Sequence, residues 1–459
     1  MNILAIHTSH DGALSIIKDD KFLVHAQIER FNHLVANTMP SLSLMLRLKK
    51  LGITFDKVII TFLTDSGHWR WENALKEYEL INSKTEKIYG ADKNHHLFHT
   101  YCAKATCGER KNMVVIDGHG GPLGKSRSVT KSNEKKIYEQ ETIFQNDKVI
   151  LQEHNNIGSD YEEKTAEILG KKFLAFKYCG KIMALSSHGG PLQAFQKATE
   201  AKIKKIMPLS DVTYSGGVAQ NVLANAQFFN YKNFKIDPLC TDQGISLGAL
   251  NYYTGGKLKI PHPTYLGFEP DYEFLHYPTF KDYDIVDAAP EDICSLLRKE
   301  PVALFQGRSE QGQRGLGNRS LLMDGTHPQA VSIVNKIKHR EWYRPFAPAI
   351  LEEYASEYFD IKGSSPYMLY VFKAKKKLPN VTAIDGTSRI QTVSQKDNLH
   401  FYNLLSAFNK KYKIPFLLNT SLNLAGHTLV EDLNDLKYML DYSSLKYAYL
   451  PDVGKLVIN

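Results

Sequence analysis

Two histidines and two aspartates have the types and spacing of a metal site. His95 and His99 are four residues apart, so a helix would carry both imidazoles on one face. Asp117 follows the apolar run 113–116, and Asp242 opens a separate acidic-glycine turn. A mixed nitrogen and oxygen ligand set suits iron, manganese or zinc better than calcium, and Fe²⁺ is the expected ion. The alternative is a surface histidine cluster that binds no metal.

Glycine-rich turns at two places in the first half of the chain predict phosphate binding. In the first turn, 117–121 (Asp-Gly-His-Gly-Gly), backbone amides can approach an anion while the carboxylate holds a cation. The second turn, 215–221 (Ser-Gly-Gly-Val-Ala-Gln-Asn), joins a predicted strand to a predicted helix. The residues expected to bind ATP, together with its Mg²⁺, are Gly118, Gly120, Gly216, Gly217 and Asn221. Ordinary turns that end strands are the alternative for both segments.

Arginine and glycine residues in the second half predict binding of phosphate or carboxylate groups. They gather in the loop 307–320 and in the aromatic-rich stretch 338–348, while an apolar run ends at 419–423 in small hydrogen-bonding side chains. Arginine beside backbone amides orients an anion through bidentate, charge-assisted bonds. The candidate residues are Arg319, Lys338, Arg340, Arg344, Arg389, Ser421 and Asn423. Exposed arginines that only solubilise the protein are the alternative.

The elements that position these groups occur twice in the first half. Predicted strands at 2–7, 13–18 and 21–26 precede a helix at 40–50 and a strand at 57–62. The pattern restarts with strands at 113–116, 127–130 and 136–141, a helix at 160–176 and a strand at 212–214. Such a duplication is typical of the α/β folds of the actin and sugar-kinase superfamily, which are built from two ribonuclease H-like halves.

The composition describes an ordinary globular protein with more than one domain. The chain has 459 residues, of which 43% are hydrophobic and 23% are charged. We expect domains at 1–265 and 283–459, joined by a linker at 266–282. A net charge of +8 permits a polyanionic partner. The apolar runs are too short to span a membrane and the five cysteines form no Cys-x-x-Cys pair, so a cytoplasmic protein with reduced thiols is expected.

Ordered motifs along nearly the whole chain resemble the nodulation-factor and antibiotic O-carbamoyltransferase family. They are His10-Asp11, Glu29-Arg30-Phe31, the His-His-x-x-His motif at His95, Asp117-Gly118, and the segments 180–183, 215–221, 307–320, 340–348, 385–387 and 419–423. Two local departures are Ala383, where the family usually has a histidine, and Gly426-His427, which replaces the usual Gly-Glu. Both departures bear on how carbamoyl phosphate is held.

The resemblance implies one reaction divided between two domains. The second domain, of YrdC-like α/β type, would make carbamoyl-adenylate from carbamoyl phosphate and ATP. The first domain, of Kae1-like type, would pass the carbamoyl group to an acceptor hydroxyl and release AMP.

The resemblance also implies residue roles by position. The residues matching those that bind carbamoyl phosphate and form the adenylate are Lys338, Arg344, Arg389, Ser421 and Asn423, with Lys338 and Arg344 catalytic. Those matching the metal ligands are His95, His99, Asp117 and Asp242. His10 matches the general base that takes the proton of the acceptor hydroxyl.

The acceptor is expected from a difference in length. Between 183 and 215 the family usually inserts a long helical segment, which is short here, so we expect an open pocket that suits a bulky, anionic acceptor. The hypothesis is a hydroxymethyl group on a DNA base, such as 5-hydroxymethylcytosine, in a phage-encoded enzyme acting in the host cytoplasm. Alternatives are a small-molecule sugar or antibiotic hydroxyl, an enzyme of the tRNA threonylcarbamoylation type, and a non-catalytic nucleotide-binding scaffold.

Overall fold

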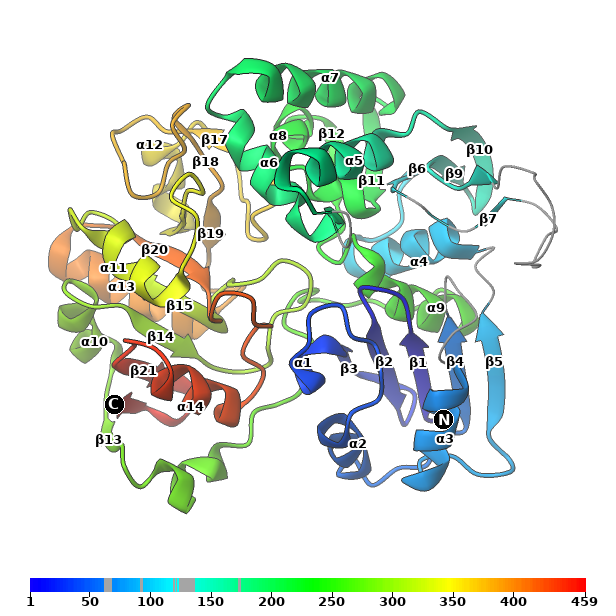
Figure 1. The fold of residues 1–459 in the computed structure, drawn as a ribbon, viewed down its shortest axis with the longest axis horizontal. Helices are drawn as coiled ribbons and strands as arrows, with labels where there is room; N and C mark the ends of the chain where they lie inside the picture. Colours follow the sequence, from blue (N-terminus) through cyan, green and yellow to red (C-terminus); the bar gives the residue numbers. More distant parts are fainter. Residues whose placement is uncertain (62–67, 91–93, 119, 121, 124–136, 172–174) are drawn as a thin grey trace. The chain divides into compact units, whose positions relative to one another are not determined.

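A computed structural model describes residues 1–61, 68–90, 94–118, 120, 122–123, 137–171 and 175–459. The predicted strand 127–130 and the turn residues 119 and 121 lie outside these described residues. The described chain forms two compact units (Figure 1). The first unit comprises Met1–Asn32, Ala36–Ile182 and Phe195–Pro263, and the second comprises His33–Val35, Met183–Ala194 and Thr264–Asn459. Among the residues that are described, no helix is long and apolar enough to cross a membrane.

The first sheet of the first unit has the strand order β3-β2-β1-β4-β5. Its strands are β1 (Ile3–His7), β2 (Ala13–Lys18), β3 (Lys21–Gln27), β4 (Lys57–Thr61) and β5 (Glu86–Gly90). β1, β2 and β3 form an antiparallel meander, whereas β1, β4 and β5 run parallel. The accompanying helices are α1 (Glu29–Asn32), α2 (Leu42–Lys49) and α3 (His68–Glu77). Every residue of β1 is buried, which explains its continuous apolar run before the final histidine.

The second sheet repeats this plan with the order β10-β9-β6-β11-β12. Its strands are β6 (Asn112–Ile116), β9 (Glu141–Gln145), β10 (Lys148–Glu153), β11 (Ser210–Ser215) and β12 (Lys232–Ile236). β6, β9 and β10 are antiparallel in turn, and β6, β11 and β12 are parallel. The two sheets therefore share order and direction, which confirms the predicted pair of ribonuclease H-like halves. A separate ribbon joins β7 (Pro122–Leu123) to β8 (Ile137–Tyr138).

Two predicted elements of the second ribonuclease H-like half have different bounds in the structure. The helix expected at 160–176 is α5 (Ile157–Leu169), and it ends because Gly170 adopts the left-handed conformation with φ of 62°. The strand expected at 136–141 is divided, since β8 ends at Tyr138 and β9 begins where Glu141 pairs with Ile116 of β6.

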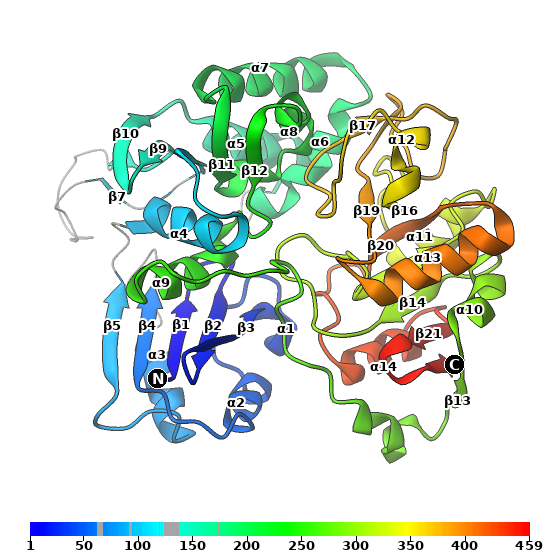
Figure 2. The ribbon, with the colours of Figure 1, turned by 180° about the vertical axis from the view of Figure 1, so that it is seen from behind.

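Helices α4 (His95–Cys107) and α9 (Ile245–Tyr253) pack against each other between the two sheets (Figures 1 and 2). α9 contacts β1, β2 and β4 of the first sheet, while α4 contacts β6 and β11 of the second. Gly248 permits this close approach, because a Cβ atom there would lie 1.9 Å from the backbone oxygen of Phe98. Three further helices follow α5 in the chain, namely α6 (Cys179–Ser186), α7 (Gly190–Ile206) and α8 (Val222–Asn225).

The second unit is built on a mixed sheet with the order β13-β22-β21-β14-β15-β20-β16-β19. Its strands are β13 (Asp284–Asp287), β14 (Val302–Phe305), β15 (Arg319–Met323), β16 (Ala347–Leu351), β19 (Gln391–Val393), β20 (Phe416–Ser421), β21 (Tyr447–Leu450) and β22 (Lys455–Ile458). Its helices are α10 (Pro290–Leu297), α11 (Ala330–Lys338), α12 (Ala355–Tyr358), α13 (Leu399–Tyr412) and α14 (Leu433–Asp441).

Helices α10 and α13 pack together, and their buried faces share one apolar core with strands of this sheet. A short ribbon pairs β17 (Phe372–Lys373) with β18 (Thr387–Ser388). The stretch predicted as a linker contains two 3₁₀ turns, Tyr272–His276 and Pro278–Phe280. That the second unit is YrdC-like stays a prediction.

Candidate functional site

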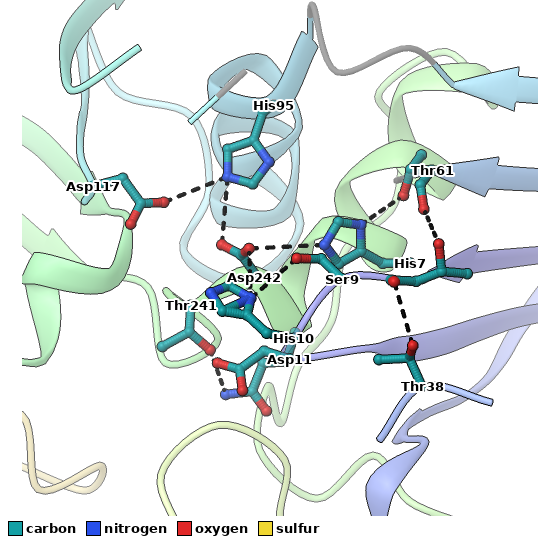
Figure 3. Close-up of polar contacts among 12 residues, drawn as sticks. His7, Ser9, His10, Asp11, Thr38, Thr61, His95, Asp117, Thr241 and Asp242 are labelled. Atoms are coloured by element: carbon teal, nitrogen blue, oxygen red, sulfur yellow. Dashed lines mark hydrogen bonds and ion pairs between the residues drawn. The ribbon is translucent and has the colours of Figure 1, made fainter. Parts of the chain in front are cut away.

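The four predicted metal ligands converge in the first unit. Figure 3 shows His95, Asp117 and Asp242 of this set. His95 and His99 lie on α4, Asp117 follows β6, and Asp242 precedes α9. The Nε2 atoms of His95 and His99 lie 3.4 and 3.3 Å from Oδ2 of Asp117. They lie 3.4 and 3.7 Å from Oδ1 of Asp242. The four potential ligand atoms are all within 4.8 Å of one another.

In this cluster, neighbouring opposite charges shift the pKa values more than burial does. Burial opposes ionisation of Asp242, but the charge of His95 and hydrogen bonds from its neighbours hold the pKa of Asp242 well below its usual range. Burial also disfavours the charged form of His95, yet Asp242 and Asp117 raise the pKa of that imidazole well above its usual value. The same carboxylates raise the pKa of His99 against its burial. Two ionised carboxylates in a buried site therefore attract positive charge.

The donor set fits a divalent cation. Nε2 of His99 is buried without a hydrogen-bond partner among the described residues. An unpaired buried polar atom is unfavourable, and a cation together with its water ligands would satisfy such atoms. Two imidazoles and two carboxylates are ligands taken by iron, manganese and zinc.

His10 lies on the other side of the Asp242 carboxylate (Figure 3). Its Nδ1 is 3.4 Å from Oδ2 of Asp242 and 3.0 Å from Oγ of Ser9. The ring of Phe176 lies 4.3 Å from the His10 ring, centroid to centroid. The His10 side chain is 35% exposed, so a substrate can reach it, but Phe176 covers one of its sides. That the pocket around His10 is open stays a prediction.

The two predicted nucleotide turns meet each other. A Cβ atom on Gly217 would lie 3.0 Å from Oδ1 of Asp117. Gly216 has φ of 91°, and a Cβ atom there would lie 2.2 Å from the backbone oxygen of Ile116, so only glycine fits. The side chain of Asn221 caps α8 by accepting from the amide of Ala224 at 3.1 Å.

The backbone amides of the first turn already have partners. The amide of Gly118 donates to Oδ1 of Asp117 at 2.8 Å, and the amide of Gly120 donates to the backbone oxygen of Glu139 at 2.8 Å. Oγ of Ser159, in the first turn of α5, donates to the backbone oxygen of Gly118 at 2.7 Å. These contacts fix the shape of the turn, and anion binding by its amides stays a prediction.

Lys338, Ser421 and Asn423 meet at one point of the second unit. Lys338 ends α11, Ser421 ends β20, and Asn423 follows two residues later. Nζ of Lys338 donates to the backbone oxygens of Ser421 and Asn423 and to Oδ1 of Asn423, each at 2.6 Å. Oγ of Ser421 also donates to Oδ1 of Asn423 at 2.7 Å.

Arginines crowd around this lysine. Burial and the nearby charge of Arg340, with those of Arg314 and Arg344, lower the pKa of Lys338 well below its usual value. Burial and Arg344 likewise lower the pKa of Arg340 to about 9 and that of Arg389 to about 10. Such mutual repulsion would be relieved by a bound polyanion.

Arg319 does not join these cations, although the sequence placed it with them. Its Nη1 donates to the backbone oxygens of Gln306 at 2.6 Å and Gly307 at 3.1 Å. Its Nη2 donates to the backbone oxygen of Glu431 at 3.0 Å, and the guanidinium lies 3.8 Å from the centre of the Phe305 ring. The side chain is fully buried, so Arg319 holds the glycine loop in place instead of facing a substrate.

Sequence reasoning missed residues of both units. His7, at the end of β1, lies 3.8 Å from Asp242 (Nε2 to Oδ2), and its only sequence signal is a polar residue closing an apolar strand. Lys177 contacts the carboxylate of Asp11, next to His10. Arg314, in the glycine loop 307–320, is one of the cations near Lys338.

Comparison with known proteins identifies similar chains. Residues 294–455 match the family described as Carbamoyltransferase C-terminus. An uncharacterized protein of Methanocaldococcus jannaschii is 28% identical, over 93% of this chain and 94% of that protein. The nodulation protein NolNO of Sinorhizobium fredii is 26% identical, over 93% of this chain and 76% of that protein. The 3'-hydroxymethylcephem-O-carbamoyltransferase of Streptomyces clavuligerus is 32% identical, over 56% and 51% respectively.

Proposed function

We propose that this chain, whose residues 294–455 match the family described as Carbamoyltransferase C-terminus, is an O-carbamoyltransferase that works through carbamoyl-adenylate and transfers the carbamoyl group to a hydroxymethyl group on a DNA base. The observation that carries the proposed mechanism is the separation of two charged sites. A cation-binding cluster lies in the first unit, and an anion-binding cluster of lysine and arginine lies in the second.

The second unit, in this proposal, activates the carbamoyl group. Water attacks the carbamoyl carbon of carbamoyl phosphate and inorganic phosphate leaves, which gives a carbamate anion. An oxygen of this carbamate then attacks the α-phosphorus of ATP, and pyrophosphate leaves as carbamoyl-adenylate forms. Lys338 and Arg344 neutralise charge on these phosphates, while Arg340 and Arg389 orient them. Ser421 and Asn423 hold the lysine ammonium where the phosphate must lie.

The first unit transfers the activated group. The acceptor oxygen forms a bond to the carbamoyl carbon, the bond to the adenylate oxygen breaks, and AMP leaves. His10 takes the hydroxyl proton through Nε2, because its Nδ1 faces Asp242 and Ser9. A divalent cation held by His95, His99, Asp117 and Asp242 would polarise the adenylate phosphate. Fe²⁺, Mn²⁺ and Zn²⁺ all suit that ligand set, and Fe²⁺ is our first choice.

Three features support the DNA acceptor. The relative from Streptomyces clavuligerus is named for a hydroxymethyl substrate, which is the same kind of primary alcohol. The net charge of +8 favours a polyanionic partner. The connection between α6 and β11 consists mainly of the single helix α7, and so short a connection suits the open pocket that a bulky acceptor requires. A base in duplex DNA would have to be flipped out of its stack, at a cost of a few kcal/mol.

The first test is mass spectrometry of nucleosides from DNA that contains 5-hydroxymethylcytosine. The DNA is incubated with the full chain, ATP, carbamoyl phosphate and Fe²⁺, and a parallel reaction lacks ATP. We expect an ATP-dependent gain of about 43 Da on the modified nucleoside, because a carbamoyl group replaces one hydrogen of the flipped base.

Parallel acceptors separate the alternatives. Carbamoylation of a sugar or hydroxymethyl small molecule, with no change in DNA, would keep the carbamoyltransferase and overturn the DNA acceptor. AMP release without carbamoyl phosphate in the reaction would contradict the activation step.

A further inference from the structure

His7 is a buried histidine that the proposed mechanism does not use. It closes β1 and is 1% exposed. Its Nδ1 lies 2.9 Å from Oγ1 of Thr61, at the end of the neighbouring strand β4. Its Nε2 lies 3.8 Å from Oδ2 of Asp242 and has no hydrogen-bond partner among the described residues (Figure 3).

The two oxygens of the Asp242 carboxylate face different groups. Oδ1 faces the metal-binding imidazoles of His95 and His99, at 3.4 and 3.7 Å. Oδ2 faces His7 and His10, at 3.8 and 3.4 Å. Figure 3 shows the ring of His95 above this carboxylate, His10 below it and His7 to its right. The orientation of Asp242 therefore decides which oxygen a cation meets.

We propose that His7 is a positioning residue of the metal site: its Nε2–H holds Oδ2 of Asp242, so that Oδ1 is presented to the cation. The proposal rests on the proposed function in one respect, namely that a cation occupies the cluster. A small movement of Asp242 toward His7 would bring Nε2 and Oδ2 within hydrogen-bond distance, and Nε2 otherwise has no hydrogen-bond partner among the described residues. Groups that orient metal ligands in this way commonly set metal affinity.

The proposed role requires the tautomer of His7 in which the hydroxyl of Thr61 donates to Nδ1. For Nε2 to carry the proton, Nδ1 of His7 must accept a hydrogen bond. The hydroxyl of Thr61 lies 2.9 Å from Nδ1 and 3.3 Å from the backbone oxygen of Ile6, so the shorter contact is the one to His7. Thr61 is itself buried, at 3% exposure, which shields the contact from water.

Co²⁺ binding to the full-length protein tests this assignment with a readout other than activity. Affinity is measured by isothermal titration calorimetry, and ligand geometry by the visible absorption bands of bound Co²⁺. The variants form two matched pairs. Thr61→Val removes the hydroxyl that Thr61→Ser keeps, and His7→Asn shortens the side chain, whereas the amide of His7→Gln still reaches Asp242.

We expect Thr61→Val and His7→Asn to weaken Co²⁺ binding about 10- to 100-fold and to shift the absorption bands. The Co²⁺ affinity of Thr61→Ser and of His7→Gln should remain within about threefold of that of the unaltered protein. The control is His96→Asn, which removes a similar buried contact, 2.7 Å from Nδ1 to Oγ1 of Thr142. It should lower the melting temperature but leave the Co²⁺ affinity within about threefold, since among the described residues His96 makes no hydrogen bond or ion pair with Asp242.

Equal Co²⁺ affinity and unchanged spectra in Thr61→Val and His7→Asn would overturn the role of His7 while the metal site stands. An equal loss in Thr61→Val and Thr61→Ser would overturn the tautomer argument. If the unaltered protein itself binds no Co²⁺, the metal site of the proposed function fails and this inference fails with it.

Discussion

At the scale of residues, the two proposed half-reactions depend on different side chains. Lys338 is held by backbone and side-chain oxygens of Ser421 and Asn423 in the second unit. His10 contacts Asp242 and Ser9 in the first unit. Because neither contact set includes a residue of the other, changes at Lys338 and His10 should affect different steps.

Lys338→Met should abolish activation of the carbamoyl group. The change removes the ammonium but keeps a side chain of similar length, so ATP-dependent pyrophosphate release is expected to fall at least about 100-fold. Pyrophosphate is measured by a coupled assay in the presence of carbamoyl phosphate.

His10→Ala is the companion variant, and it should retain pyrophosphate release while transfer to the acceptor falls about 10²- to 10⁴-fold. Transfer is followed by mass spectrometry of the acceptor. Normal transfer by His10→Ala would remove this residue from its proposed role, and equal loss of both steps in both variants would argue against two separate sites.

At the scale of elements, the metal cluster depends on how closely α4 and α9 approach. α4 carries His95 and His99, and Asp242 stands three residues before α9 begins. Gly248 lies at the crossing, where no side chain fits against the backbone of Phe98. The distance between the imidazoles and the carboxylate is thus set by a glycine outside the cluster.

Gly248→Ala should therefore force the helices apart. Overpacking against a rigid backbone oxygen typically destabilises a protein by about 1–3 kcal/mol. We expect a lower melting temperature together with weaker Co²⁺ binding, measured by thermal denaturation and by calorimetry.

The matched control is Gly180→Ala, also within a helix. Among the described residues, no atom beyond its chain neighbours and its own helix backbone lies within 4 Å of where its Cβ would be placed, so alanine should leave stability unchanged or raise it by up to about 1 kcal/mol. A Gly248→Ala protein as stable as the unaltered chain would contradict the packing argument.

At the scale of the whole molecule, the relevant quantity is net charge. An excess of eight positive charges lies on a chain whose proposed acceptor is a polyanion. Cationic side chains that contact phosphates release counterions when DNA binds, which makes binding weaken with added salt.

Carbamoylation of DNA should consequently fall steeply between about 50 and 200 mM salt, by 10-fold or more if several phosphates are contacted. The measurement is the initial rate at subsaturating DNA. Pyrophosphate release in the same buffers is the control, because it requires no DNA. An initial rate of DNA carbamoylation that does not change with salt concentration would contradict an acceptor site that contacts DNA phosphates.

The sequence by itself determined the repeated succession of strands and helices along the chain and the four metal-binding candidates. Both are encoded locally: alternation between apolar strands and turns marks each half, and the spacing of His95 and His99 places them on one helix face. The bounds near Gly170 and Glu141 were less accurate, because a left-handed glycine and the pairing with β6 decided them. Strand pairing is a contact between distant segments, so no local pattern encodes it.

Only the tertiary structure decided which charged residues act together. Arg319 and Arg340 look equivalent in the sequence, yet Arg319 donates to backbone oxygens of the glycine loop, whereas Arg340 lies among the other cations. His7 joins the metal cluster only because β1, β4 and the turn before α9 converge. The physical reason is the same in each case: burial and electrostatic coupling depend on neighbours in space, and these neighbours come from segments far apart in the chain.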